Sequence, residues 1–354
     1  MVSLKTTCGF QNIRGPGIFS FLETLLLGLS SAMTRLSVSL QVIQLQLCTI
    51  NIVKTFKRYL GISSFLWGLQ RKHNIVLPGK VSPTLEVPDS IFKPQYVTQK
   101  LSVTKAPPDA EVKSPKQIEG MRKTCSIAAS LLKFAGSLIK VGMTTDELDK
   151  AVHAECLSKG AYPSPLLYQG YPKSICTSVN NVVCHGIPDD RRLLDGDIIC
   201  VDITVFYDGY HGDTSATFLV GSVAGEMCHL VEVARQCRDA GIAVCRPKAR
   251  FSEIGWAVSN CAESAGYSVV PEFCGHGIGE YFHGPPDIIH VAYDDDAEME
   301  EGMTFTIEPI ICMGSPEIRI LQDGWTAVTT DNSWSAQFEH TVLVTRSGVE
   351  VLTT

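Results

Sequence analysis

The sequence contains no Cys-x-x-Cys pair, although it has thirteen cysteines. Paired cysteines at that spacing are the signature of zinc fingers and thiol redox motifs, so neither class of site is supported. The number of cysteines is odd, and they are scattered along the chain. This pattern is typical of buried thiols in a reducing compartment and does not indicate a disulfide framework.

Acidic residues are nearly absent from the first eighty residues, which carry nine Lys or Arg and a single acid, Glu23. The chain has 354 residues and a net charge of −7, so this +8 segment leaves −15 for the remainder. A basic segment rich in Ser, Thr and Leu is typical of an organellar presequence, and we expect residues 1–75 to be a targeting leader. The acidic body argues against nucleic-acid binding.

The uncharged stretch at residues 36–53 lacks the unbroken apolar character of a membrane span, because serines, glutamines and an asparagine interrupt it. Each polar group costs free energy in hydrocarbon, so we expect no stable membrane insertion. Residues 76–113 lack any sustained period and contain repeated prolines. They predict an irregular tether without regular helix that lies over the surface of the following domain.

Regular structure is expected from Ser114, a helix N-cap followed by Pro115 at the first helical position. Apolar residues then recur at three- and four-residue spacing, which predicts an amphipathic helix. Thr144 and Glu147 have the spacing of a capping box and open a second helix. The expected helices span about residues 114–142, 144–160, 225–244 and 252–266, and β-rich sequence lies at 198–220, 303–320 and 338–344. Two helices with strands, followed by two more, hint at an internal duplication.

Two carboxylates lie on one predicted hairpin. Its β-rich sequence is divided by an Asp-Gly pair at residues 208–209, which is a strong signal for a two-residue turn. With that turn, Asp202 faces Ser215 and Asp213 faces Thr204, so the two acids share a face as diagonal neighbours roughly 7–8 Å apart. That separation suits a pair of metal ions roughly 3.5–4 Å apart. Two exposed acids on a solvated strand face are the alternative at this point.

Three more candidate ligands come from three other segments. His276 lies between glycines, which let the backbone approach a ligand closely. A lone histidine is more often structural, whereas a histidine among glycines is more often functional. Glu308 ends one apolar β-rich stretch and Glu339 begins another, so each is expected to be buried and to need a cationic partner. Four acids and one histidine suit Mn, Fe, Co or Zn in a dinuclear carboxylate site.

These segments together resemble the type I methionine aminopeptidases over about residues 114–354. The cysteine-rich N-terminal region of the cytosolic eukaryotic type I enzymes is absent, and the interval between His276 and Glu308 is too short for the type II insertion. The tether, through Ile75-Val-Leu-Pro and Lys93-Pro-Gln-Tyr-Val, resembles the organellar, mitochondrial form. The resemblance rests on Tyr171-Pro-Lys-Ser-Ile-Cys-Thr-Ser-Val-Asn-Asn-Val-Val-Cys-His-Gly-Ile-Pro188, His211-Gly-Asp-Thr214, Gly275-His-Gly-Ile-Gly279, Phe305-Thr-Ile-Glu-Pro309 and Ser335-Ala-Gln-Phe-Glu-His-Thr341.

The resemblance implies an α/β (α+β) domain of the pita-bread fold, the creatinase/aminopeptidase type, with a pseudo-twofold duplication and a central dinuclear metal site. It implies removal of the initiator methionine from newly made polypeptides, with a preference for a small second residue, by a metallo-exopeptidase that uses two divalent metal ions. Asp202 would bind one metal, Asp213 and Glu339 would bridge both, and His276 and Glu308 would complete the other. Glu308 would also act as the catalytic base.

The resemblance further implies two catalytic histidines and a methionine pocket. His185 and His283 would hydrogen-bond the scissile amide and stabilise the oxyanion, and the alternative for His185 is a residue that caps a turn. Pro165 stands where some bacterial members carry a cysteine, which alters the pocket but no ligand. For Phe273, the alternative interpretation is a residue of the hydrophobic core. The implied substrate-binding residues are Tyr168, Tyr171, Cys176, Phe273, Phe282 and Trp325.

For the protein as a whole, the resemblance implies a monomer in the mitochondrial matrix after leader cleavage, with the plastid as the alternative location. Its partners would be the N-termini of newly made polypeptides. Xaa-Pro aminopeptidases and dipeptidases are the rival function, since they use the same five ligands, but they usually carry a larger N-terminal domain. A non-catalytic binding module of the same fold is the second rival, and such relatives typically lose ligands that this chain retains.

Overall fold

The computed structural model describes residues 75–101 and 105–354. These residues belong to one compact unit, which begins at Asn74. The predicted leader lies outside the described residues except for its last residue. Within the described part, no helix combines the length and apolar character that crossing a membrane requires.

The helices are α2 (Gln95–Thr98), α3 (Pro115–Leu138), α4 (Thr145–Ser158), α5 (Gly225–Ala243) and α6 (Ser252–Ser264), with one 3-10 turn, η1 (Tyr168–Gly170). The strands are β1 (Tyr162–Pro163), β2 (Cys176–Val179), β3 (Val182–Cys184), β4 (Ile198–Tyr207), β5 (Tyr210–Leu219), β6 (Ser268–Val269), β7 (Gly275–Gly277), β8 (Gly284–Ile288), β9 (Thr304–Ile307), β10 (Ile310–Cys312), β11 (Ile318–Ile320), β12 (Ala327–Thr329), β13 (Ser335–Gln337), β14 (Glu339–Thr345) and β15 (Gly348–Val351).

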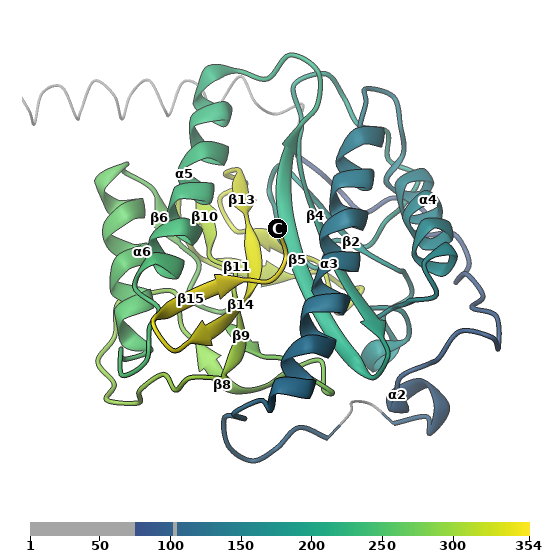
Figure 1. The fold of residues 1–354 in the computed structure, drawn as a ribbon. Helices are drawn as coiled ribbons and strands as arrows, with labels where there is room; N and C mark the ends of the chain where they lie inside the picture. Colours follow the sequence, from purple (N-terminus) through teal and green to yellow (C-terminus); the bar gives the residue numbers. More distant parts are fainter. Residues whose placement is uncertain (1–74, 102–104) are drawn as a thin grey trace, which may run out of the picture. The chain divides into compact units, whose positions relative to one another are not determined.

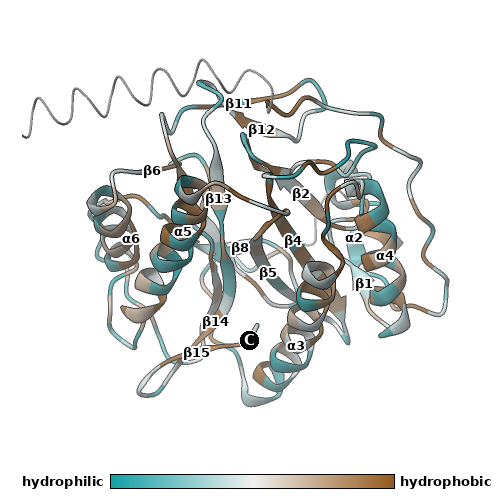
Figure 2. Ribbon diagram, turned by 90° about the horizontal axis from the view of Figure 1, so that it is seen from above, coloured by the Kyte–Doolittle hydropathy of each residue, from teal (hydrophilic) through white to brown (hydrophobic). Residues whose placement is uncertain are grey.

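An antiparallel sheet forms the centre of the described unit, in the order β1-β4-β5-β14-β9-β7-β8, with β2 paired to β4 and β15 to β14. Two smaller sheets, β13-β10-β6 and β11-β12-β3, adjoin it. The helix pair α3 and α4 lies over the half that contains β4 and β5, and the pair α5 and α6 covers the other half (Figures 1 and 2). The expected duplication is therefore visible as two helix pairs on one curled sheet.

The predicted N-cap at Ser114 and the predicted capping box at Thr144 are both present, and Ser114 also forms a capping box. The Ser114 side chain accepts from the backbone N–H of Gln117, and the Gln117 side chain in turn accepts from the Ser114 N–H. The same reciprocal pair joins Thr144 and Glu147 at the start of α4. These bonds satisfy N–H groups that have no partner within the helix, which is why each helix begins where the sequence indicates.

Helix α3 ends a turn earlier than predicted. Its last residue is Leu138, since Ile139 takes an extended backbone conformation. The chain then turns through Gly142, whose φ of +86° favours glycine, and the Gly142 N–H donates to Leu193 O. The apolar period continues past the helix because Ile139 still packs against the core formed by α3 and the sheet.

The tether contains one helical turn, α2, which the sequence analysis excluded. Pro94 has a φ of −67° and its carbonyl accepts from Val97 N, so a proline that cannot continue a helix here begins one. Tyr96 within this turn is only 2% exposed. The tether is therefore packed into the part of the unit formed by residues 114–354 at this point and does not merely lie on its surface.

The contact between α3 and β5 fixes the strand that carries Asp213. A Cβ on Gly212 would lie 2.9–3.0 Å from the backbone of Cys125, so only glycine allows this close approach of helix and strand. Successive residues of a strand point to opposite faces. Gly212 therefore faces the helix, and its neighbour Asp213 faces the cavity on the other side of the sheet.

Candidate metal centre and adjoining pocket

The predicted hairpin forms with the predicted register. Its turn is at residues 208–209, where both φ values are positive, +49° and +93°, as a two-residue hairpin turn of this kind requires. Asp202 pairs with Ser215, and Asp213 pairs with Thr204. The two acids therefore lie on one face of the sheet, as predicted.

The glycines beside His276 are explained by contacts between strands. A Cβ on Gly275 would overlap Thr306 O, and one on Gly277 would overlap Pro285 O. The two glycines allow β7 to lie close against β8 and β9, where a larger residue would not fit. This close packing holds the His276 ring at the cavity. The sequence analysis attributed these glycines to close approach of a ligand, whereas the structure shows close approach of neighbouring backbone.

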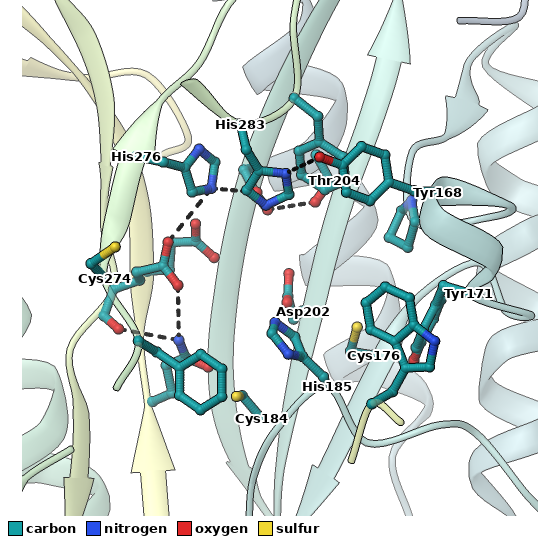
Figure 3. Close-up of a pocket in the computed structure, with 18 of the residues that line it drawn as sticks. Tyr168, Tyr171, Cys176, Cys184, His185, Asp202, Thr204, Cys274, His276 and His283 are labelled. Carbon is teal, nitrogen blue, oxygen red and sulfur yellow. Dashed lines mark hydrogen bonds and ion pairs between the residues drawn. The ribbon is translucent and has the colours of Figure 1, made fainter. Parts of the chain in front are cut away.

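All five candidate metal ligands line one cavity of about 330 Å³. His276 Nε2 lies 3.8 Å from Asp213 Oδ2 and 3.7 Å from Glu308 Oε1. One ligand atom each from Asp213, His276 and Glu339 lie within 4.8 Å of one another. Asp202 belongs to the same lining (Figure 3). Residues separated by up to 137 positions in the chain thus line one cavity.

The donor set fits divalent metal ions. No Lys or Arg is among the residues that line the cavity, although five of them are carboxylic acids, the four candidate ligands and the exposed Glu272. Asp202 Oδ1 is buried without a hydrogen-bond partner among the described residues. Burial raises the pKa of Asp202 to about 7 and that of Glu308 to about 8, and burial together with neighbouring acids raises the pKa values of Asp213 and Glu339 well above their usual range. A cluster of acids this costly to ionise needs a cation.

The tautomer of His276 can be assigned from its neighbours. Its Nδ1 lies 3.2 Å from Gly277 O, and because a carbonyl only accepts, Nδ1 carries the proton. The lone pair on Nε2 then faces Asp213 and Glu308. Burial lowers the pKa of His276 to about 4, so the ring is neutral at physiological pH. A neutral imidazole oriented through its second nitrogen is the usual form of a metal-ligating histidine.

Residues that the sequence analysis did not single out hold the acids in place. Thr204 Oγ1 donates to Asp213 Oδ1 at 2.7 Å, and Thr306 Oγ1 donates to Glu308 Oε1 at 2.8 Å. The backbone N–H of Glu308 donates to His290 Nε2 at 3.1 Å. The predicted register contained the signal for Thr204, which faces Asp213. Nothing in the sequence pointed to His290, which is buried.

The two candidate catalytic histidines lie on different sides of this cavity (Figure 3). His283 is beside His276, with ring centroids 4.2 Å apart, and its Nδ1 is 2.9 Å from the Tyr168 hydroxyl. His185 has a φ of +54°, which is uncommon for a residue other than glycine and is found disproportionately at functional sites. Burial lowers the pKa of His185 to about 4.

The six predicted pocket residues all line the same cavity. Tyr171 meets Trp325 edge to face, with centroids 5.1 Å apart, and Tyr168 packs on Phe282 at 4.8 Å. Phe273 is only partly buried and packs edge to face against His185, so it lines the cavity and also borders the adjacent core cluster. Lining residues that the sequence analysis did not select include Gln169, Cys184, Glu272, Cys274 and Ile310.

Comparison with known proteins agrees with this geometry. Residues 119–346 match the model of metallopeptidase family M24. The chain is 57% identical over 285 residues to the human protein "Methionine aminopeptidase 1D, mitochondrial", covering 79% of this chain and 84% of that one. It is 55% identical over 291 residues to the zebrafish protein of the same name, covering 82% and 86%.

Among solved structures, the methionine aminopeptidase from Rickettsia prowazekii superposes with a TM-score of 0.68 and 43% identity, covering 69% of this chain and all of that one. The prolidase from Pyrococcus horikoshii superposes with a TM-score of 0.56 and 23% identity over 69% of this chain and 63% of that one, which is similarity of fold alone. The fold is therefore the pita-bread fold that the sequence analysis expected.

The tether takes part in the similarity to the human relative. Seventy-nine per cent of 354 residues is about 280 residues, whereas residues 114–354 number only 241. The match must therefore include at least about 39 residues before Ser114.

Proposed function

The chain belongs to metallopeptidase family M24 and, within it, to the type I methionine aminopeptidases of organelles, and we propose that its cavity removes N-terminal methionine with two metal ions bound to the five converging ligands. As a member of this family it is a hydrolase that works with divalent metal ions and acts on the N-termini of newly made proteins. The number of ions and the residue assignments are the proposal. The ligands are Asp202, Asp213, His276, Glu308 and Glu339.

The observation that carries the proposal is the uncompensated charge of the cavity. The four candidate carboxylate ligands lie there, Asp213 and Glu339 buried and the other two half-buried, with no Lys or Arg among the lining residues. His276 presents a lone pair toward two of these acids. Four carboxylates carry four negative charges, which two divalent ions balance. Bound divalent ions polarise the substrate carbonyl and lower the pKa of water, which is the chemistry that peptide hydrolysis needs.

Glu308 has the surroundings of a general base. Thr306 and Gln337 donate to its two carboxylate oxygens at 2.8 Å and 3.3 Å, so the carboxylate is fixed in orientation. A base is most effective when its pKa is near the working pH. Burial raises the pKa of Glu308 to about 8, before any bound cation is considered. We propose that Glu308 takes the proton of the attacking water.

We propose that His283 and His185 contact the scissile peptide. When the Tyr168 hydroxyl donates to Nδ1 of His283, the proton of the neutral ring is on Nε2, where it can be donated to the substrate. His185 lies between Phe273 and Trp325, at the start of the apolar part of the cavity. Its neutral ring can hydrogen-bond the same peptide from the opposite side.

The apolar part of the cavity supports selection of methionine. Tyr171 and Trp325 form one wall, and the Cys176 thiol is buried beside them. Burial raises the pKa of Cys176 well above its usual range, so it offers a neutral, polarisable sulfur to a thioether. A small second residue is the preference that we propose for the adjoining position.

The experiment is peptide cleavage by protein that has been stripped with chelator and resupplied with Co or Mn. We expect metal-dependent release of methionine from Met-Ala-Ser, much slower cleavage of Met-Leu-Ser and none of Ala-Pro-Ala. Asp213→Asn should abolish cleavage. Asp208→Asn, at the exposed turn of the same hairpin, is the matched control and should leave the rate unchanged.

The other outcomes separate the rival functions. Cleavage of Ala-Pro-Ala alone would assign the chain to the Xaa-Pro enzymes, and folded protein with no cleavage under any metal would support a binding module. We further propose that residues 114–354 form the catalytic domain, with residues 76–113 as its tether and 1–75 as a leader. The mitochondrial names of the two relatives support a mitochondrial location, for which we propose a monomer in the matrix.

A further inference from the structure

We propose that residues 76–99 of the tether are a positioning element of the methionine pocket, acting through Tyr96 on Tyr168 and thereby on His283. This proposal rests on the proposed function, because it assigns His283 to the peptide that is cleaved. Residues 76–101 and 105–113 of the tether contribute no candidate metal ligand and no residue of the cavity lining. Any effect of the tether on the reaction is therefore indirect, through its contacts with residues that line the pocket.

Tyr96 is the side chain by which α2 enters the catalytic part of the unit. It is 2% exposed, and its hydroxyl donates to Ser164 O at 2.5 Å. Its ring meets the ring of Tyr168 edge to face, with centroids 5.2 Å apart and an angle of 82°. Both partners belong to the loop that leads into the pocket, so Tyr96 fixes the backbone of that loop at one end and an aromatic side chain further along it.

Tyr168 passes this constraint to His283. Its hydroxyl is 2.9 Å from His283 Nδ1, and the two rings have centroids 5.1 Å apart. In Figure 3 the Tyr168 hydroxyl points directly at His283, which lies beside His276 at the metal-binding end of the cavity. The hydrogen bond to Nδ1 determines which way the second ring nitrogen faces, so a shift of Tyr168 reorients the group that meets the substrate.

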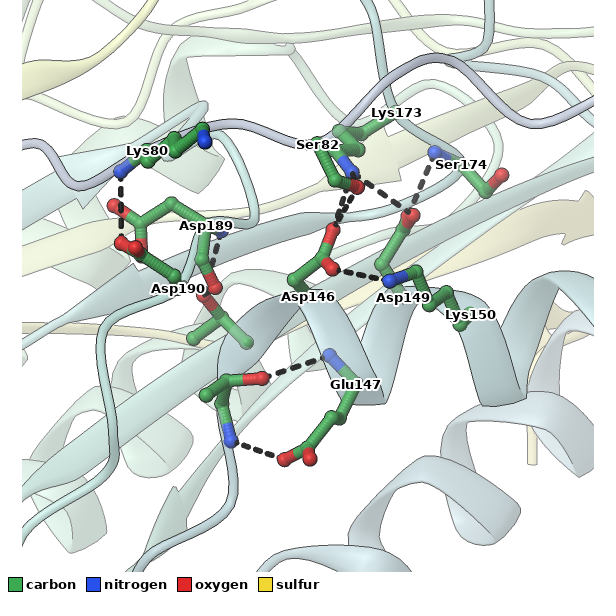
Figure 4. Close-up of polar contacts among 12 residues, drawn as sticks. Lys80, Ser82, Asp146, Glu147, Asp149, Lys150, Lys173, Ser174, Asp189 and Asp190 are labelled. Atoms are coloured by element: carbon green, nitrogen blue, oxygen red, sulfur yellow. Dashed lines mark hydrogen bonds and ion pairs between the residues drawn. The ribbon is translucent and has the colours of Figure 1, made fainter.

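The tether is anchored to the next part of the loop through a buried charge cluster (Figure 4). Lys173 is 1% exposed, and its ammonium donates to Ser82 Oγ at 2.8 Å and to Asp146 Oδ1 at 2.5 Å. Ser82 Oγ in turn donates to the same oxygen of Asp146. Ser82, a residue of the tether, therefore completes the hydrogen bonding of the buried Lys173–Asp146 ion pair. Lys173 lies two positions after the pocket residue Tyr171.

A second contact reinforces this anchor. His153 Nε2 lies 3.1 Å from the tether carbonyl Glu86 O, and its Nδ1 lies 2.7 Å from Ser174 Oγ. Asp149 Oδ1 accepts from the backbone N–H of Ser174 and of Ile175. The segment between Tyr171 and Cys176, which are both pocket residues, is therefore held from behind by side chains that also hold the tether.

The beginning of the tether is bound to the loop around His185. Val76 N–H donates to Asn181 Oδ1 at 2.7 Å, and Gly79 N–H donates to Asp189 Oδ2 at 2.5 Å. One segment thus contacts each of the loops that carry Tyr168, Tyr171 and His185. The similarity to the human relative extends into this segment, as expected if it belongs to the working enzyme.

The test is cleavage of Met-Ala-Ser by the full-length protein and its Tyr96→Leu and Tyr96→Phe variants, each also made with His283→Ala and assayed with enzyme in excess. Tyr96→Leu should lower kcat/KM about tenfold or more, mainly through kcat, because a misplaced catalytic group loses rate steeply. Tyr96→Phe keeps the ring and loses only one hydrogen bond, so a loss of about threefold is expected.

In the His283→Ala background, either change at Tyr96 should lower the rate by less than about twofold, because the side chain that Tyr96 positions is gone. Gln95→Ala removes an exposed side chain from the same helical turn and is the matched control, with wild-type activity expected. If Tyr96→Leu does not fold, Tyr96→Phe tests the proposal in the same way, by comparing its loss of rate with and without His283→Ala.

Full activity of Tyr96→Leu would overturn the proposal. Equal losses with and without His283 would also overturn it, because Tyr96 would then support only the stability of the fold. A wild-type protein that releases no methionine contradicts the proposed function itself, and this result is obtained before any variant is compared.

Discussion

Removing the metal ions should make the stability of this protein fall as the pH rises. Burial raises the pKa of Asp202 from 3.8 to about 7. A carboxyl with a raised pKa holds its proton more tightly in the folded state, so its contribution to stability is complete below about pH 4 and is lost as the pH rises through 7. At about 1.4 kcal/mol per pH unit, this one carboxyl changes the free energy of unfolding by on the order of 4 kcal/mol.

Glu308 extends the same dependence toward pH 8, since burial raises its pKa to about 8. For a folded unit of this size, about 4 kcal/mol corresponds to a decrease of about 8 °C in Tm. Divalent metal ions should reverse the decrease, because they bind the ionised acids of the folded state only. At a metal concentration of about 100 Kd the added stability is about 2.7 kcal/mol.

The assay is calorimetry of chelated protein at pH 5, 6, 7 and 8, with and without added Mn. Asp202→Asn should flatten the pH dependence of the metal-free protein and remove most of the stabilisation by Mn, whereas Asp208→Asn should behave as the wild type. A metal-free Tm that is constant or increases between pH 5 and 8 would refute the electrostatic account of the cavity. A Tm that does not respond to Mn would refute the metal site.

Three further results are expected. Lys173→Met leaves Asp146 without its buried partner and should cost about 3–5 kcal/mol, a loss of at least about 6 °C in Tm by calorimetry. His290→Phe removes the acceptor for the Glu308 backbone N–H, at a cost of about 1–3 kcal/mol in stability. In protein that is still folded it should lower kcat on Met-Ala-Ser by about tenfold, since it displaces the proposed base; an unchanged kcat would contradict that role. Cys274 has part of its surface exposed at the cavity, while partial burial of its thiol, with Asp287 nearby, raises its pKa to about 11. Its alkylation by iodoacetamide, followed by mass spectrometry, should therefore accelerate about tenfold per pH unit from pH 7 to 10; a rate already maximal at pH 7 would contradict this.

The parts of the fold that could be predicted are those determined by local sequence. The turn at residues 208–209 and the period of two along a strand are enough to place Asp202 opposite Ser215 and Asp213 opposite Thr204. The capping boxes at Ser114 and Thr144 are likewise contained within four residues. The end of α3 was misplaced because the apolar spacing reports packing against the core, which continues beyond the last helical hydrogen bond.

The contacts that orient the site are set by tertiary structure, and the sequence carries no local sign of them. His290 lies eighteen residues from Glu308, and neither spacing nor composition relates the two. The tether was read as a surface segment because its prolines exclude long helices. Its buried side chain Tyr96 meets Ser164, which is 68 residues away in the chain. A contact of that kind becomes visible only once both segments are placed in the fold.

The central claim is that two divalent metal ions lie between the five converging side chains. It is tested most directly by anomalous diffraction at the Mn absorption edge from crystals grown with Mn. The account predicts two strong peaks, about 3.5–4 Å apart, within coordination distance of Asp202, Asp213, His276, Glu308 and Glu339. Crystals of active enzyme that show no anomalous peak among these side chains, or a peak only elsewhere on the chain, would contradict it.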